Sequence, residues 1–379
     1  MNALLRAAER LCVWVEGLAQ GERWVARTAL LATALALLCS FPRPDTFWRA
    51  GSAPEWAPLL GKIERPLAPQ PELAAASHGA KTAFRLVPPL VGHALSLGPL
   101  GLKLLEALCG VALLACVAVG AERAAGDRRC AVLVTLLVAS CFPGVTAFVE
   151  HRGFFDGVAL CGLAAACATR HPLGILAGLA LAHWTDERAV IASGLVALVH
   201  LADTPREAGI RRLPDPRVLA VGVALASYAA LRLFLGSRYG LSTPTAGTGA
   251  RFLVNQVNNA PLGLWTGLEG GWLLVLAAGA ALARAGRRAL LLAGLAAGGA
   301  VALVALSVWD ITRSMAYLLP GLFLALRVLR DHEPAPELLL LCRAGFLLAL
   351  LWPNYYTAGK GETSWLYPLP LMLWNYFKG

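Results

Sequence analysis

Residues Gly174–His200 read GILAGLALAHWTDERAVIASGLVALVH, in which two apolar runs flank the charged triplet Asp186-Glu187-Arg188. A single membrane-crossing helix over this stretch would bury three ionisable side chains near the bilayer centre, at a cost of a few kcal/mol for each charge. We therefore expect three short elements over residues 157–202, with the charged break facing water or protein on the extracytoplasmic side.

Apolar runs of this kind recur along almost the whole chain. Its 379 residues are 58% hydrophobic and 15% charged, whereas an average soluble domain is roughly 45–50% apolar and about 25% charged. The composition predicts an all-α, polytopic transmembrane helix bundle and argues against a soluble enzyme or a secreted disulfide scaffold. The nine cysteines have no CxxC spacing, so neither disulfides nor a zinc site are indicated.

The net charge of +10 has a membrane explanation, because Lys and Arg fall mostly in the short loops between apolar runs, where the positive-inside bias places them. No nucleic-acid partner is expected. The same bias and the Ala-, Leu-, Gly- and Arg-rich composition predict a bacterial cytoplasmic (inner) membrane protein of the cell envelope with a cytoplasmic N-terminus. Membrane lipids are its expected surroundings, and protein partners are unknown.

We interpret residues 1–379 as one integral membrane domain with about eleven transmembrane elements. Residues 1–22 are expected to form an interfacial helix, 43–98 a long extracytoplasmic loop with a half-helix at 84–97, and 365–379 an interfacial C-terminus. The other predicted spans are 24–41, 101–120, 130–149, the three short elements over 157–202, 218–235, 262–282, 290–308, 314–328 and 338–351.

Under this topology most unusual polar residues lie on the extracytoplasmic side. Ionisable groups at helix ends that face a protein interior mark a functional site by default. The candidates are Asp45, Arg85, Glu150, Arg152, Asp156, Asp186, Glu187, Arg188, Asp310 and Arg313.

Each candidate also has a purely structural explanation, and both stay open at this point. Asp156 fits a helix cap, and Asp310 with Arg313 fits an N-cap with an i,i+3 ion pair. His151 and His183 lie near acidic residues, but their spacing matches no standard metal-ligand motif. No cofactor is predicted, and a divalent metal is the open alternative.

The pattern resembles the GT-C superfamily of membrane glycosyltransferases. Those enzymes have a long first outer loop with an acidic residue shortly after the first span, a second acidic site in the next outer loop, and short or broken helices near the active site. Here Asp45 corresponds to the first acid, and Glu150 or Asp156 to the second. The segments Gly174–His200 and KTAFRLVPPLVGHAL, residues 81–95, are similar to stretches of that family, but no Asp-Asp or Asp-x-Asp pair lies near Asp45.

The resemblance implies transfer of a sugar from a polyprenyl phosphate donor to an acceptor on the extracytoplasmic face. Asp45 would be the catalytic base, with Glu150 or Asp156 as its catalytic partner. Contacts to substrate and phosphate would come from the other candidates, Arg85, Arg152, Asp186, Glu187, Arg188, Asp310 and Arg313.

Two other function classes fit the sequence. A secondary transporter also has broken helices with charged breaks, although no internal repeat is evident and the ionisable residues gather at one face. A non-catalytic membrane assembly protein would use the charged turns only to fix helix packing.

Overall fold

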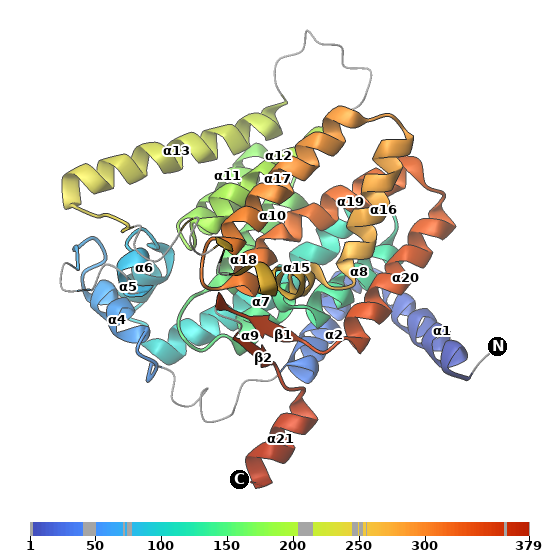
Figure 1. The fold of residues 1–379 in the computed structure, drawn as a ribbon, viewed down its shortest axis with the longest axis horizontal. Helices are drawn as coiled ribbons and strands as arrows, with labels where there is room; N and C mark the ends of the chain where they lie inside the picture. Colours follow the sequence, from blue (N-terminus) through green and yellow to red (C-terminus); the bar gives the residue numbers. More distant parts are fainter. Residues whose placement is uncertain are drawn as a thin grey trace.

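The computed structural model describes residues 3–40, 51–70, 73, 78–203, 215–244, 249, 253–254, 256–359 and 362–378. Figure 1 shows a helical molecule in which one short pair of strands lies beside α15. The elements in chain order are α1 (Ala3–Glu16), η1 (Gly17–Ala19), α2 (Trp24–Cys39), α4 (Trp56–Glu64), α5 (His78–Lys81), α6 (Val87–Ala94), α7 (Pro99–Ala125), α8 (Arg128–Ser140), α9 (Phe142–Val149), α10 (Asp156–Ala168), α11 (Pro172–His183), α12 (Arg188–Ala202), α13 (Pro216–Tyr239), η2 (Val257–Asn259), α15 (Ala260–Leu268), α16 (Gly271–Arg284), α17 (Arg288–Leu306), α18 (Ile311–Met315), η3 (Ala316–Leu318), α19 (Leu319–His332), α20 (Ala335–Leu351), β1 (Tyr355–Thr357), β2 (Thr363–Trp365) and α21 (Leu369–Lys378).

Helix α8 forms the centre of the core. Every residue from Cys130 to Ser140 is buried, and α2, α7 and α20 pack against it. Asp127 is the N-cap of α8, since its Oδ1 accepts a hydrogen bond from the backbone N–H of Arg129 at 2.7 Å. An apolar helix that is buried all round is typical of the interior of a membrane bundle.

Four described helical segments are long and apolar enough to cross a membrane: Pro99–Ala125, Pro216–Tyr239, Arg288–Leu306 and Ile311–His332. The number rises to six if each of two bent helix pairs counts as one span. These helices indicate a membrane protein, and the expected eleven spans are not confirmed. The three short elements over residues 157–202 are present as α10, α11 and α12.

Two predicted straight spans are broken. The span over residues 130–149 bends by 53° between α8 and α9, where Pro143 at the start of α9 prevents a continuous helix. The span over 262–282 bends by 92° between α15 and α16. There Glu269 adopts a positive φ of 44°, followed by two glycines.

The described part of the segment 43–98 packs over one end of the bundle. The Trp56 indole is fully buried, donates to the carbonyl of His151 at 2.8 Å and meets Phe155 edge-on. At the start of α6 the N–H groups of Leu86 and Val87 both donate to the carbonyl of Trp184. This segment is thereby fixed to the α9–α10 loop and to the break between α11 and α12.

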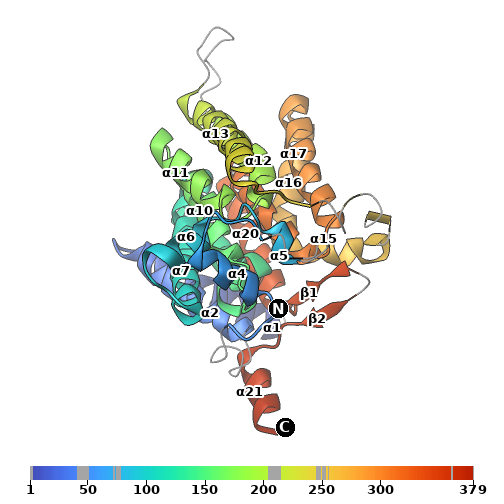
Figure 2. The ribbon, with the colours of Figure 1, turned by 90° about the vertical axis from the view of Figure 1, so that its left-hand side faces the viewer.

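Helices α13 and α17 lie at the edge of the bundle (Figure 2). Only 28% of the apolar window of α13 and 11% of that of α17 are buried, against 89% for the span Ile311–His332. Since both helices are apolar, their open faces are suited to lipid. The two-stranded sheet pairs Tyr355 with Trp365 in antiparallel register, and Asp310 forms an isolated bridge with Ala358.

Helices α10 and α11 cross at two glycines. A Cβ added to Gly162 would lie 2.5 Å from the carbonyl oxygen of Gly178, and one added to Gly178 would lie 2.7 Å from that of Gly162. We expect Gly162→Leu to lower the free energy of unfolding by at least about 1–3 kcal/mol, because backbone must move to admit the side chain. Gly222→Leu is the matched control, since nothing lies within 4 Å of its added Cβ. Equal thermal midpoints of the two variants in detergent would contradict the observed crossing.

Candidate functional site

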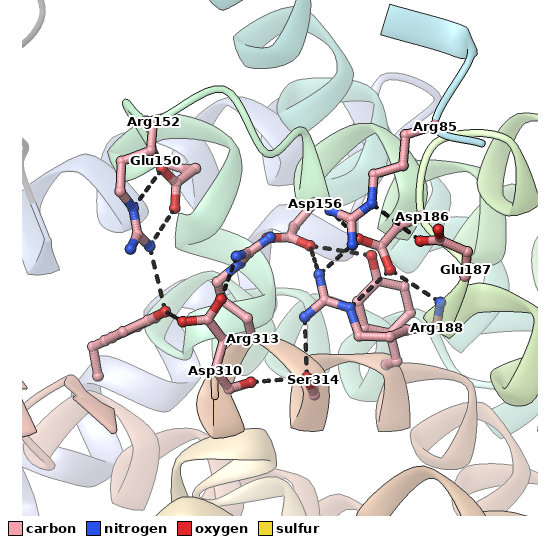
Figure 3. A network of polar contacts seen from close by, with 12 residues as sticks. Arg85, Glu150, Arg152, Asp156, Asp186, Glu187, Arg188, Asp310, Arg313 and Ser314 are labelled. Carbon is pink, nitrogen blue, oxygen red and sulfur yellow. Dashed lines mark hydrogen bonds and ion pairs between the residues drawn. The ribbon is translucent and has the colours of Figure 1, made fainter. Parts of the chain in front are cut away.

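Charged residues from four segments remote in sequence lie at or near helix ends and meet in one network of polar contacts (Figure 3). We call these residues the charged cluster: Arg85, Glu150, Arg152, Asp156, Asp186, Glu187, Arg188, Asp310 and Arg313. They are nine of the ten residues singled out from the sequence. The tenth, Asp45, lies outside the described residues.

Asp156 is the centre of the cluster. It is fully buried at the first residue of α10, where the free N–H groups of a helix start favour a carboxylate. Its Oδ1 accepts from Arg188 Nη2 at 2.7 Å and from the Tyr317 hydroxyl at 3.2 Å, while its Oδ2 accepts from Arg313 Nε at 2.5 Å. One carboxylate therefore holds two guanidinium groups that would otherwise repel each other.

One branch of the cluster runs from Arg188 toward the α6 side. Arg188 Nε and Nη2 donate to the two oxygens of Asp186, both at 2.7 Å. Asp186 in turn lies 2.8 Å from Arg85 Nη1, and Arg85 Nε donates to Glu187 Oε2 at 3.1 Å. The break between α11 and α12 is thereby held by a series of ion pairs in which positive and negative side chains alternate.

The other branch runs from Arg313 toward the strands. Arg313 Nη1 donates to Asp310 Oδ2 at 2.7 Å, and Asp310 Oδ1 accepts from the Tyr356 hydroxyl at 2.6 Å. Arg152 reaches the same hydroxyl at 3.3 Å and binds Glu150 with two nitrogens. The i,i+3 pair expected between Asp310 and Arg313 is present, as part of the larger cluster. Asp310 precedes α18, but its side chain makes no capping hydrogen bond.

Three carboxylates of the cluster are held in the ionised form. Burial alone would raise the pKa of Asp186, Glu150 and Asp310, but neighbouring arginines outweigh it and hold each pKa below its ordinary value. Arg188 and Arg85 act on Asp186, Arg152 on Glu150, and Arg313 on Asp310. These acids are thus suited to positioning cations.

A cavity of about 430 Å³ lies directly beside the cluster. Its charged lining consists of five basic side chains and two acidic ones, Lys81, Arg85, Arg188, Arg232, Arg313, Glu187 and Asp310. Arg85, Arg188 and Arg313 are paired with acids of the cluster, whereas Arg232 donates to the hydroxyls of Tyr228 and Thr243, so the charge of Arg232 suits an anion. Its apolar lining includes Ile191 of α12 and Val304 of α17, and only 11% of the apolar window of α17 is buried within the protein. We call this space the anion cavity.

Sequence reasoning missed several residues of this site. Arg232 lines the anion cavity from α13, held by bonds to the Tyr228 hydroxyl at 2.6 Å and to Thr243 Oγ1 at 2.9 Å. An arginine within the apolar stretch SYAALRLFL was the available signal. Tyr356 gave none, because it lies in a short strand between helices.

In the described part of the chain, no three His, Cys, Asp or Glu side chains are grouped so that they could hold a metal ion. His183 instead contacts Ser193, with 2.7 Å between Nε2 and Oγ.

No protein-family model matches the chain, and comparisons with curated proteins and with solved structures find no relative. The function must therefore be argued from the site itself.

Asp156→Asn is expected to lower the free energy of unfolding by about 3–5 kcal/mol, because it leaves two buried arginines sharing one fewer negative charge. Glu333→Gln is the control. It removes an ion pair whose Arg284 side chain is 67% exposed, and such pairs contribute about 0–1 kcal/mol. Denaturant unfolding in detergent measures both, and similar losses for the two variants would contradict the central role of Asp156.

Acid should unfold the wild type partly through Asp186. A carboxylate whose folded pKa lies below its unfolded value, about 3.9 for Asp, adds stability that is fully present at neutral pH and is lost as pH falls below the unfolded pKa. We expect the thermal midpoint to fall less between about pH 5 and 3 in Asp186→Asn than in the wild type. Parallel curves would contradict the ion pairing of Asp186.

Proposed function

We propose that the protein is a membrane glycosyltransferase of the GT-C type, which transfers a sugar from a polyprenyl phosphate donor to an acceptor on the extracytoplasmic face. The observation that carries the proposal is the anion cavity. It combines basic side chains with apolar lining from α17, an apolar helix that is only 11% buried. A lipid phosphate has both properties, because it joins an anion to an apolar chain.

Two arginines of the cavity would interact with a phosphate leaving group in the proposed reaction. Arg188 and Arg313 are fixed by Asp156 before any substrate arrives. Arginine donors arranged in advance stabilise charge as it develops on phosphate oxygens. Arg313 Nη2 is buried and has no hydrogen-bond partner among the described residues, which leaves a donor for such an oxygen.

In the proposed reaction the acceptor oxygen attacks the anomeric carbon of the sugar. The bond from that carbon to the phosphate oxygen breaks, and its electron pair stays on the departing polyprenyl phosphate. A carboxylate takes the proton of the acceptor hydroxyl. All the described acids of the cluster bind arginines, and only Glu187 and Asp310 also line the cavity. Asp156 and Glu150 do not line it and act as positioning residues. Asp45 stays a proposed base on the resemblance alone.

The proposed orientation has the cluster outside and the N-terminus in the cytoplasm of a bacterial cell. At the end of the bundle opposite the cluster, arginines surround the helix ends, including Arg123, Arg128, Arg217, Arg284 and Arg330. This arrangement agrees with the positive-inside bias. The short helices α2, α10, α11 and α12 are the elements that would bring the span count toward eleven.

A secondary transporter is the second candidate, favoured by one observation. Glu269 is fully buried at the sharp bend between α15 and α16, and neither of its oxygens accepts from an N–H or O–H group in the described chain. Carboxylates at helix breaks are typical of ion-coupled transporters. Solute uptake by proteoliposomes that is lost in Glu269→Gln would favour this candidate over the transferase.

Arg232→Gln tests the transferase proposal without disturbing the ion pairs of the cluster. We expect binding of a synthetic polyprenyl phosphate to the purified protein to weaken about tenfold, since a hydrogen bond to a charged group contributes roughly 1.5–3 kcal/mol. Transfer from a panel of radiolabelled polyprenyl phosphate sugars should fall in parallel.

Arg238→Gln is the matched control, because Arg238 is exposed on the same helix and does not line the cavity. Native mass spectrometry in detergent gives the binding, and extraction of labelled product gives the transfer. Equal binding by the two variants would exclude the anion cavity as the donor site.

A further inference from the structure

A second cavity lies at the end of the bundle opposite the charged cluster. Its volume is about 550 Å³, and its polar lining consists of Arg287, Arg288, Arg327, His332 and Asp331. His332 follows Arg313 by 19 residues along the helical span Ile311–His332. At about 1.5 Å per residue this is roughly 30 Å, close to the thickness of the bilayer core. We call this space the basic cavity.

The basic cavity continues into an apolar groove between α12, α16, α17 and α19. The groove has a volume of about 310 Å³, and Leu282, Leu290 and Val328 line both spaces. The rest of its lining is almost entirely apolar. Together, the two spaces form a basic site from which an apolar channel runs along α17, a weakly buried apolar helix.

Arg287 and Arg288 are the cations that the fold leaves available. Other arginines at this end have internal partners: Arg284 pairs with Glu333, Arg327 with Asp203, and Arg330 donates to the carbonyl of Arg123. Within the described ranges, the side chains of Arg287 and Arg288 have no hydrogen-bond or ion-pair partner. Both follow Gly286, which has a φ of +64° in the turn between α16 and α17: Arg287 is the N-cap of α17 and Arg288 its first residue.

The groove also has room that packing does not use. Gly294, Gly298 and Gly299 of α17 line it, and an added Cβ would meet nothing closer than 3.9 Å at the first two and nothing within 4 Å at the third. By contrast, a Cβ at Gly120 of α7 would lie 2.7 Å from the Phe323 ring. The glycines of the groove are therefore not required by helix contacts, and the absence of side chains keeps the channel open.

We infer that the basic cavity and the apolar groove together bind an anionic phospholipid, with its phosphate at Arg287 and Arg288 and an acyl chain along α17. Basic pockets between helices at the membrane surface bind anionic headgroups, and the unpaired arginines supply the complementary charge. A zwitterionic lipid would bring its own cation against them. This site is separate from the anion cavity and does not depend on the proposed transferase activity.

The test compares phosphatidylglycerol with phosphatidylcholine on the full chain in detergent, by native mass spectrometry and thermal unfolding. We expect retention of phosphatidylglycerol and a raised unfolding midpoint. The double variant Arg287→Gln/Arg288→Gln should bind it on the order of thirtyfold more weakly, since each basic residue near an anionic lipid surface contributes about 1 kcal/mol. Equal retention of the two lipids by the wild type would overturn the inference.

Gly298→Leu tests the groove independently. The new side chain has space to fill, so the lipid-free protein should unfold at the wild-type temperature while phosphatidylglycerol binding falls. Gly222→Leu, whose added Cβ also meets nothing within 4 Å but lies on α13, should leave that binding unchanged. If both variants bind phosphatidylglycerol as the wild type does, the groove is not the site of the acyl chain.

Synthetic polyprenyl phosphate is the third ligand and distinguishes the two sites. Arg287→Gln/Arg288→Gln should still bind it, and Arg232→Gln should still bind phosphatidylglycerol. Failure of the transferase proposal would thus leave this inference standing. If polyprenyl phosphate binding were lost in the double variant, the basic cavity would hold the lipid phosphate of the donor instead, and the inference would be wrong.

Discussion

A carboxylate that is withdrawn from water must be compensated by cations, and Asp156 meets this requirement with two arginines at once. The α9–α10 loop, the break before α12 and the turn into α18 meet at this one side chain. Each arginine then satisfies a second acid, Asp186 on one side and Asp310 on the other. The position of these segments relative to one another therefore depends on charge compensation as much as on apolar packing.

The sequence predicted this arrangement in part. A charged triplet between two apolar runs could not be buried as one straight helix, and the three short helices α10, α11 and α12 follow from that cost. Nine candidates that were expected on the same side of the bilayer do meet in the structure. The sequence did not predict which acid contacts which arginine, because those distances are set by packing between helices far apart in the chain.

The errors have physical reasons as well. The bend at Cys141 lies in an apolar stretch, and the bend at Glu269-Gly270 contains a single acidic residue among apolar and small ones, so hydropathy alone gives a continuous span in both places. Arg232 was overlooked because one cation in a long apolar helix does not change the hydropathy pattern, although it lines the anion cavity. Tyr356 joins the site only through the strand pair that follows α20. Contacts of this kind depend on how distant segments pack and do not follow from a hydropathy pattern.

The alternating ion pairs also restrict where the molecule can open. If any one of the cluster segments moved outward, a buried charge would lose its ion-pair partner in a low-dielectric interior. We therefore expect the cluster end of the molecule to be rigid. Helix α17 carries no such restraint along its apolar length and is only lightly buried. We therefore expect the bundle to open toward the bilayer by displacement of α17, and not by separation of the charged loops. Large amphiphiles would enter and leave through the same opening.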